Sequence, residues 1–287
     1  MTGAAAAIVP VAPVAPVAIV TGGARGIGRA IAEALAARGF TVAACDIEPD
    51  TTVESTVESP AASTHAAASA TSTVEKSAAA IHPFAFDLAD LDAHQPLVDR
   101  IADRFGRIDC VVHNAGIGAT RGDLLDLPPA DFDRQLGVNL RGTLFFSQAS
   151  AKWMRDHPLG DATGADASTA RSQIFITSVS AAMVSPNRAG YCVSKAGLSM
   201  WAKALALRLA ADDIAVFEVR PGIIRTAMTE AAAAEYDARI AAGLVPAGRW
   251  GAPADVGRVV AGLAGGGFGF ATGSVIHADG ALSVARL

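Results

Sequence analysis

Cysteine is scarce in this sequence, and its positions suit neither disulfides nor zinc. There are three cysteines, Cys45, Cys110 and Cys192, with no C-x-x-C pair among them, so neither a disulfide framework nor a zinc site is indicated. The six histidines show no metal-ligand spacing either. We therefore expect no metal site, and a reducing, cytoplasmic environment fits the free thiols.

Runs of basic residues are also missing. The chain carries a net charge of −5, and no cluster of Lys and Arg could neutralise several phosphates. This argues against a general nucleic-acid binder. The 51% apolar content and the 28 glycines among 287 residues are typical of a globular protein with many tight turns, long enough for one large α/β domain or two small ones.

One apolar run, residues 4–20, approaches the length of a membrane span. Three prolines interrupt any helix there, and no Lys or Arg precedes the run as in a signal peptide. We expect a disordered leader over residues 1–15, followed by a buried strand, and no association with a membrane.

Short apolar runs alternate with helix-length segments along the chain. The runs predict six buried strands, at Val17–Val20, Thr41–Cys45, Cys110–Val112, Ile174–Thr177, Ala215–Val219 and Val275–His277. The longer segments predict helices at Ile27–Arg38, Leu91–Phe105, Ala130–Trp153, Ala189–Ala210 and Ala254–Leu263. This alternation predicts an α/β fold, a three-layer, Rossmann-type, doubly wound parallel sheet in a single domain over residues 16–287.

Two stretches depart from the alternation. Residues 48–80 are rich in Ala, Ser and Thr and fall where a crossover helix belongs, so we expect a low-complexity insert, with a weak helix as the alternative. The segment His157–Ser172 consists of small and polar residues, which predicts a surface loop. Neither stretch suggests chemistry.

Tyr191 and Lys195 lie four residues apart in one predicted helix. This spacing puts both side chains on the same helix face, where an ammonium group would favour the ionised form of the phenol. The pair would then act as a proton-transfer device. On these two residues alone, the alternative is an ordinary helix surface.

A glycine-rich turn follows the first predicted strand, with glycines at 22, 23, 26 and 28. Such a turn lets the backbone approach a diphosphate, and the free N–H groups of the next helix attract its charge. A turn packed for close contact is the alternative. The strand before the turn and the helix after it favour a dinucleotide site.

Two acidic residues bear on the choice of cofactor. Asp46 follows the second predicted strand, where its carboxylate could bind an adenosine ribose and repel a 2′-phosphate, which favours NAD over NADP. Arg25 in the glycine turn could instead pair with that phosphate. Asp87 could bind the adenine amine or initiate a helix.

Together these residues resemble the classical short-chain dehydrogenase/reductase family over residues 16–285. The resemblance rests on an ordered set: Thr21–Gly28, Asn114-Ala115-Gly116, Asn139, Ser178, Tyr191 with Lys195, and Pro221-Gly222 followed by Thr226. Family members commonly pair through the helices that carry Asn139 and Tyr191. The resemblance therefore implies a homotetramer or a homodimer.

The family's catalytic tetrad corresponds to Ser178, Tyr191, Lys195 and Asn139. By resemblance, Tyr191 would exchange a proton with the substrate oxygen, which Ser178 would hold in place. Lys195 would lower the pKa of Tyr191 and hold the nicotinamide ribose. Asn139 would position Lys195 through a water molecule.

The resemblance also implies a set of cofactor contacts spread over the chain. They are Gly22, Arg25, Gly26, Ile27, Gly28, Asp46, Ile47, Asp87, Leu88, Asn114, Ala115, Gly116, Tyr191, Lys195, Pro221, Gly222, Ile224 and Thr226. The sequence departs from the family pattern at His113, where an Asn usually precedes the Asn-Ala-Gly triplet. It departs again at Ala281, in the last place of an Asp-Gly-Gly motif.

Substrate contacts are expected in the loops after the central strands, and the candidates are Arg121, Met183, Arg188 and Met228. An apolar lining would come from the two methionines with Val184, Leu244 and Trp250, although core packing is the alternative for each. If two of Arg121, Arg188 and Arg225 point inward, they favour an anionic or polyhydroxylated substrate. Solvated surface arginines are the alternative.

The sequence thus predicts a short-chain, NAD(P)-dependent alcohol dehydrogenase or ketoreductase that moves a hydride between nicotinamide and a carbonyl or secondary hydroxyl group of a small molecule. One alternative is a 3-oxoacyl-acyl-carrier-protein reductase, which requires a basic docking patch and a preference for NADPH. An alternative of another class is a non-catalytic dinucleotide-binding sensor.

Overall fold

A computed structural model describes residues 15–53, 80–119, 121–159 and 171–286 of the chain. The predicted leader, apart from residue 15, lies outside the described residues. So does most of the predicted insert, residues 54–79, and much of the predicted loop, residues 160–170.

In the described part of the chain, seven parallel strands form one sheet in the order β3-β2-β1-β4-β5-β6-β7. The strands are β1 (Val17–Thr21), β2 (Thr41–Asp46), β3 (Ile81–Ala85), β4 (Cys110–His113), β5 (Arg171–Ile176), β6 (Ile214–Pro221) and β7 (Val275–Ala278). All six predicted strands are present, with small shifts at their ends. The strand order reverses between β1 and β4, which is where sheets of this type bind ligands.

The seventh strand, β3, is missing from the sequence prediction because Pro83 lies in its middle. A proline lacks the N–H that a central strand needs, so its presence argues against a strand. In the structure β3 lies at the edge of the sheet and pairs only with β2. At an edge, one side of the strand needs no hydrogen-bonding partner, so the proline is tolerated.

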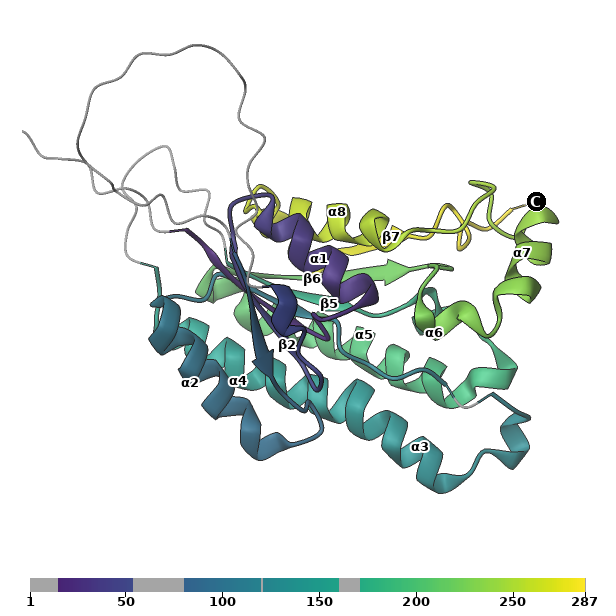
Figure 1. Cartoon of the computed structure of the whole chain (residues 1–287), viewed down its shortest axis with the longest axis horizontal. Helices are drawn as coiled ribbons and strands as arrows, with labels where there is room; N and C mark the ends of the chain where they lie inside the picture. The colour runs from purple at the N-terminus through teal and green to yellow at the C-terminus, as the bar shows by residue number, and fades with distance from the viewer. Residues whose placement is uncertain (1–14, 54–79, 120, 160–170, 287) are drawn as a thin grey trace, which may run out of the picture.

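Helices cover both faces of the sheet, so the three-layer Rossmann-type prediction is confirmed (Figure 1). One face carries α1 (Gly26–Ala36) and α8 (Pro253–Ala264), and the other carries α2 (His94–Phe105), α4 (Thr143–Asp156) and α5 (Ala189–Leu209). Three further helices lie toward the carboxyl ends of the strands: α3 (Pro129–Leu136), α6 (Ala227–Glu230) and α7 (Ala233–Ala241). The last two are absent from the sequence prediction.

The predicted long helix Ala130–Trp153 is three segments in the structure. Helix α3 passes into a π-helical segment, η4 (Gly137–Gly142), which continues as α4. The π segment is bounded by two glycines, and the wider turn accommodates a buried Asn139. Periodicity alone does not distinguish such a segment from an α-helix.

The predicted loop His157–Ser172 also needs correction, because Arg171 and Ser172 belong to β5 and are buried. The Arg171 guanidinium donates hydrogen bonds to the backbone carbonyls of Met154 and His157. These bonds compensate for the burial of a charged group at the start of the strand.

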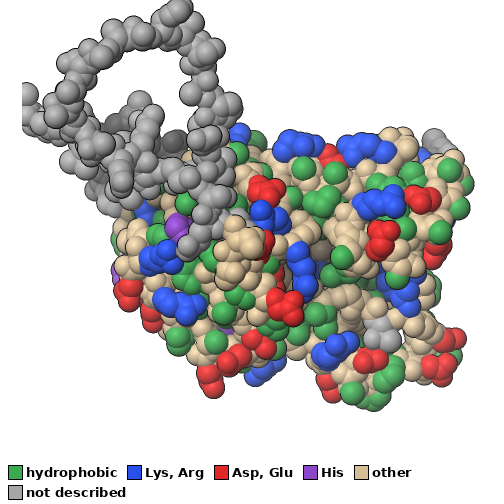
Figure 2. Space-filling model, viewed as in Figure 1, with side chains coloured by type: hydrophobic (Ala, Val, Ile, Leu, Met, Phe, Trp, Pro, Cys, Tyr) green, Lys and Arg blue, Asp and Glu red, His purple; other side chains and the backbone are tan. Residues whose placement is uncertain are grey.

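The surface mixes charges of both signs. Basic and acidic side chains are interspersed over the face seen in Figure 2, as expected for a chain with a small net charge. Within the described ranges, no helix is long and apolar enough to cross a membrane. The three cysteines are free thiols, and Cys45 and Cys110 are buried.

Candidate active site

The glycine turn after β1 is joined to the end of β4. The Asn114 side-chain amide donates hydrogen bonds to the carbonyls of Thr21 and Gly22, at 3.0 and 3.2 Å. The backbone N–H groups of Asn114 and Ala115 both donate to the Thr21 hydroxyl at 3.1 Å. The predicted Asn114-Ala115 segment therefore fixes the turn at the point where the strand order reverses.

Glycine is required at two places in this turn. Gly22 has φ +65°, and a Cβ there would lie 2.9 Å from the Ala115 Cα. A Cβ on Gly28 would lie 1.9 Å from the Gly22 carbonyl oxygen. Helix α1 can therefore begin directly beneath the turn only with glycine at these positions.

Gly26 lies next to the loop after β6. It has φ +56°, and the nearest atom to a Cβ there would be the Thr226 methyl, at 3.8 Å. Thr226 in turn donates its backbone N–H to the Thr229 hydroxyl at 3.0 Å. The structure thus brings together residues 200 positions apart that the sequence assigned to one site.

Asp46 ends β2, as predicted, and is only 9% exposed. Its carboxylate accepts a hydrogen bond from the Ala24 N–H of the glycine turn at 3.2 Å. Ile47, the next residue, is exposed. Arg25, within the turn, lies 3.8 Å from the Glu48 carboxylate. The cation of the turn therefore already faces a negative charge.

The predicted pair Asp87 and Leu88 has local roles in the structure. The exposed Asp87 carboxylate accepts the Ala89 N–H at 2.8 Å, and Asp90, not Asp87, caps the following turn by accepting the Asp92 N–H. Leu88 is buried, and its carbonyl is hydrogen-bonded to the His94 ring at 3.0 Å. The helix-initiating alternative for Asp87 is therefore wrong.

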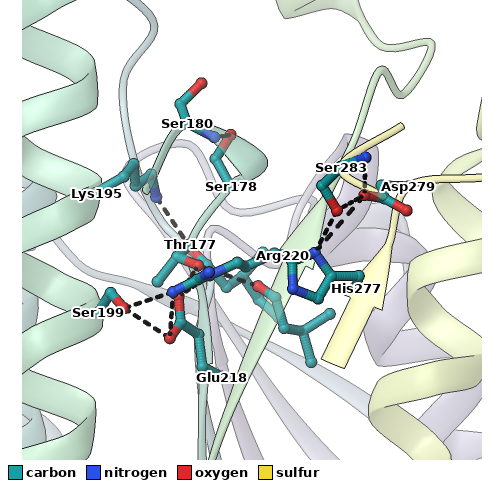
Figure 3. A network of polar contacts seen from close by, with 12 residues as sticks. Thr177, Ser178, Ser180, Lys195, Ser199, Glu218, Arg220, His277, Asp279 and Ser283 are labelled. Carbon is teal, nitrogen blue, oxygen red and sulfur yellow. Dashed lines mark hydrogen bonds and ion pairs between the residues drawn. The ribbon is translucent and has the colours of Figure 1, made fainter. Parts of the chain in front are cut away.

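Ser178, Tyr191 and Lys195 meet at the carboxyl end of β5. Ser178 lies just beyond the strand and is hydrogen-bonded to the Tyr191 side chain. The Lys195 ammonium is 5.8 Å from the centroid of the Tyr191 ring and donates to the Ile176 carbonyl at 3.0 Å. Figure 3 shows Lys195 reaching from α5 toward the end of this strand.

The electrostatics of this pair differ from the sequence expectation. Burial raises the pKa of Tyr191, and the Ser178 hydrogen bond and the charge of Arg188 oppose this. Burial lowers the pKa of Lys195 to about 8, against the opposing charge of Glu218. The expected lowering of the Tyr191 pKa by Lys195 is not seen, because the ammonium group is itself desolvated and turned to the Ile176 carbonyl.

Asn139 is fully buried in the π segment and holds the loop after β4. Its side-chain oxygen accepts the Ile117 N–H at 2.7 Å, and its side-chain nitrogen donates to the Ile117 carbonyl at 3.0 Å. A Cβ on Gly116 would lie 3.1 Å from the Asn139 oxygen and 3.7 Å from the Lys195 nitrogen. Asn139 and Lys195 therefore flank Gly116 from two sides.

A glycine turn that opens a helix at the point where the strand order reverses fits the diphosphate of a dinucleotide. Gly116 lies farther along the same end of the sheet, next to Asn139 and Lys195. No group of three or more metal-ligating side chains occurs among the residues that the structure describes.

Comparisons with known proteins agree with this geometry. A family model described as enoyl-(acyl carrier protein) reductase matches residues 22–283. The chain belongs to the short-chain dehydrogenase/reductase family. Members of this family move a hydride between a nicotinamide cofactor and a carbonyl or hydroxyl group, and this oxidoreductase class holds for the chain.

Individual relatives cover nearly the whole chain. The 3-oxoacyl-[acyl-carrier-protein] reductase FabG of Thermotoga maritima is 32% identical over 93% of this chain and 97% of the relative. Versicolorin reductase stcU of Emericella nidulans is 32% identical over 91% of this chain and 93% of the relative. A crystal structure of 3-oxoacyl-[acyl-carrier protein] reductase from Brucella melitensis in complex with NAD is 49% identical, with a TM-score of 0.83, and covers 96% of this chain and 100% of that one.

The substrate side of this short-chain dehydrogenase/reductase site holds three arginines, which differ in their carboxylate partners. Arg121 is 3.3 Å from Glu235, and Arg225 lies near Glu230 and Asp237 and over the Trp250 ring. Arg188 has no carboxylate partner within the described ranges and lies 5.9 Å from the centroid of the Tyr191 ring. Only one of the three arginines is therefore available to an anion beside Tyr191.

The predicted apolar lining separates into two groups. Met183, Val184 and Met228 are exposed, and Met228 packs against Gly118 in the loop after β4. Leu244 and Trp250 instead pack on a small apolar cluster that includes Tyr236. For these last two the core alternative is the correct one.

Two charged residues next to the site, Glu218 and Arg220, are absent from the sequence prediction. Both lie in β6, where Glu218 is 2% exposed and accepts the Arg220 guanidinium at 2.7 Å. Opposite charges two residues apart in an otherwise apolar strand point to one face of the sheet. That pattern is the signal that could have revealed the pair.

Proposed function

We propose that the protein is an NAD(H)-dependent ketoreductase or secondary-alcohol dehydrogenase in which Tyr191 transfers the proton. The main support for this proposal is the position of the Tyr191 side chain. Tyr191 is hydrogen-bonded to Ser178 at the carboxyl end of β5 and lies beside Lys195. This end of the sheet also holds the glycine turn, and Gly116 lies there next to Lys195.

Three residues of the tetrad then have separate roles in the reduction of a ketone. A nicotinamide cofactor, when bound, would supply the hydride. Tyr191 donates its proton to the carbonyl oxygen as the oxygen gains negative charge, and the Ser178 hydroxyl orients that oxygen. Lys195, whose ammonium group lies 5.8 Å from the centroid of the Tyr191 ring, would hold the nicotinamide ribose.

Replacing Tyr191 by Phe should reduce kcat by a factor of about 10²–10⁴, because a positioned acid/base contributes this much. The matched control is Tyr236→Phe, since Tyr236 is the only other tyrosine and is buried in a cluster with Ile240 and Val245. Steady-state rates with NADH and a panel of ketones would show the difference. Parent-level turnover by Tyr191→Phe, with cofactor binding intact, would contradict the catalytic role of Tyr191. A parent protein that binds cofactor but turns over no ketone or alcohol would instead support the sensor.

We also propose a preference for NAD(H) over NADP(H). The support is the buried Asp46 at the end of β2 and the pairing of Arg25 with Glu48. Arg29 is similarly paired with Asp50 at 3.0 Å. A 2′-phosphate entering here would meet a carboxylate and no free cation among these residues.

The ratio of kcat/KM for NADH to that for NADPH should be about tenfold or more in the parent, and Asp46→Ala should bring it close to one. Glu33→Ala is a suitable control, because Glu33 pairs with the other side of Arg29 on the exposed face of α1. A parent enzyme that prefers NADPH would contradict this proposal and favour the 3-oxoacyl-acyl-carrier-protein reductase alternative.

For the substrate, we propose a ketone with an anionic group that Arg188 binds. 3-Oxoacyl thioesters are the first compounds to test, because the similar proteins named above are 3-oxoacyl-[acyl-carrier-protein] reductases. Small thioesters and keto acids test the anion contact directly, and the thioester of an acyl carrier protein tests the 3-oxoacyl-acyl-carrier-protein reductase alternative.

Arg188→Gln should lower kcat/KM for acetoacetyl-coenzyme A or a sugar keto acid about tenfold more than for a neutral ketone. Any effect of Arg188 on the Tyr191 pKa acts on all substrates, so the difference between substrates isolates the anion contact. Arg121→Gln is the control, because its guanidinium is held by Glu235. Equal losses for charged and neutral ketones would remove the anion-binding role.

We further propose a homo-oligomer that forms through α5, in the cytoplasm. Three apolar side chains on α5 are spaced seven residues apart and therefore lie on one helix face: Val193, Met200 and Leu207, which are 51%, 65% and 85% exposed. Phe145 on α4 is also exposed. A second copy of the chain would cover this stripe.

A further inference from the structure

We propose that Glu218, held by Arg220, is a positioning residue for Lys195: its carboxylate ties α5 to the end of β5 and places a negative charge close to the ammonium group. Neither residue belongs to the family's catalytic tetrad, and neither contacts a predicted cofactor residue in the hydrogen bonds of the site.

The Glu218 carboxylate connects three elements. One oxygen accepts the Thr177 hydroxyl and the Arg220 Nε, both at 2.7 Å. The other accepts the Ser199 hydroxyl at 2.8 Å and the Arg220 Nη2 at 3.3 Å. Arg220 also donates to the Ser199 hydroxyl at 2.9 Å. The network therefore spans β5, β6 and α5 (Figure 3).

Two residues of the network, Thr177 and Ser199, are close in sequence to residues of the catalytic tetrad. Thr177 lies between Ile176, whose carbonyl accepts the Lys195 ammonium, and Ser178, which bonds Tyr191. Ser199 lies one helical turn after Lys195 on α5, so the two side chains point the same way. Movement of the Glu218 carboxylate would change the spacing between the strand end and the helix.

Charge adds to this geometric role. Burial lowers the pKa of Lys195, and the charge of Glu218 is what opposes this. The other groups that face Lys195 are Tyr191 on its own helix, Arg220 on β6, and the neutral Asn139 across Gly116. Among the described residues that face Lys195, Glu218 is therefore the anion that favours its protonated form.

The test uses the complete chain without cofactor and measures the titration of the Lys195 side chain directly. The chain has only four lysines, so lysine ¹³Cε signals can be followed by NMR across pH, with Lys195 assigned by its loss in Lys195→Met. Glu218→Gln should move the Lys195 titration midpoint down by about half a pH unit or more. The control is Asp109→Asn, a similarly buried carboxylate that pairs with Arg107 at the opposite end of the sheet.

Glu218→Gln leaves Arg220 buried without its partner, so the double variant Glu218→Gln, Arg220→Gln provides a second test in which both charges are removed. It should fold and should show a smaller downward shift, because removal of the Arg220 cation raises the Lys195 midpoint. An activity measurement, which rests on the proposed function, should show a fall in kcat of about tenfold with little change in the KM for NADH. A parent enzyme inactive on every ketone would contradict the proposed function but leave the titration as a test of Glu218.

An unchanged Lys195 midpoint in both Glu218 variants would overturn the proposal. A shift of the same size in Asp109→Asn would also overturn it, because the effect would then be a general consequence of losing a buried charge.

Discussion

At the scale of residues, the site is built from ionisable groups that folding places in unfavourable surroundings. Lys195, Glu218 and His113 are all buried, and only Glu218 has its charge matched by a cation at 2.7 Å. Ala281 has φ +67°, a conformation that glycine adopts without strain. This explains why the family pattern has glycine in that place.

His113 allows a prediction on acid stability. Its Nε2 is hydrogen-bonded to Gln173 at 2.6 Å, its ring stacks on Phe175, and burial lowers its pKa to about 4. Above pH ~6.5 the ring is neutral in both folded and unfolded states, so it has no effect on the pH dependence. Between about pH 6.5 and 4 the unfolded state takes up the proton first, so the free energy of unfolding should fall by up to about 3 kcal/mol.

Urea unfolding at pH 7.5 and 4.5 would measure this loss. His113→Asn should show a loss about 2 kcal/mol smaller than the parent, whereas His157→Asn, at an exposed position, should behave like the parent. The idea fails if His113→Asn is as acid-sensitive as the parent.

At the scale of elements, the departures from regular structure coincide with the site. The π segment η4 carries Asn139, and π-helical turns inside α-helices are often found at functional sites. The side chain of Asn139 replaces a backbone partner for Ile117, with both its oxygen and its nitrogen engaged. The short η5 (Val179–Ala181) begins at Ser178, whose hydroxyl accepts the Ser180 N–H at 3.0 Å.

At the scale of the whole molecule, we expect the α5 stripe to decide the oligomeric state. A charged side chain at the centre of an apolar interface is costly to bury, so Leu207→Asp with Met200→Asp should convert an oligomer into a monomer. Light scattering coupled to gel filtration would measure the mass. Leu125→Asp is the control, because Leu125 is as exposed as Leu207 but lies in the loop segment Leu124–Asp126.

A parent protein that is monomeric at micromolar concentration would contradict this expectation. A Met200 and Leu207 double variant with the mass of the parent oligomer would place the interface elsewhere on the molecule.

The sequence by itself determined the α/β architecture, the glycine turn and the pairing of Tyr191 with Lys195. These follow from local rules: apolar runs form strands, glycine permits φ above zero, and residues four apart share a helix face. Ser178 was grouped with this pair by the family resemblance. The ordered spacing of Asn114, Asn139 and Pro221 also indicated the family before any fold was known.

Tertiary structure decided which of these groups share an environment. Only the sheet order places β1 beside β4, so that Asn114 reaches Gly22. Only the packed fold places the Ile176 carbonyl where the Lys195 ammonium group donates to it. Burial in that fold raises the pKa of Tyr191. Pro83 in an edge strand and the π turn at Asn139 depend on neighbours distant in sequence, and so does the Glu218 network. Local pattern cannot anticipate them, because desolvation and hydrogen bonding depend on the packed molecule.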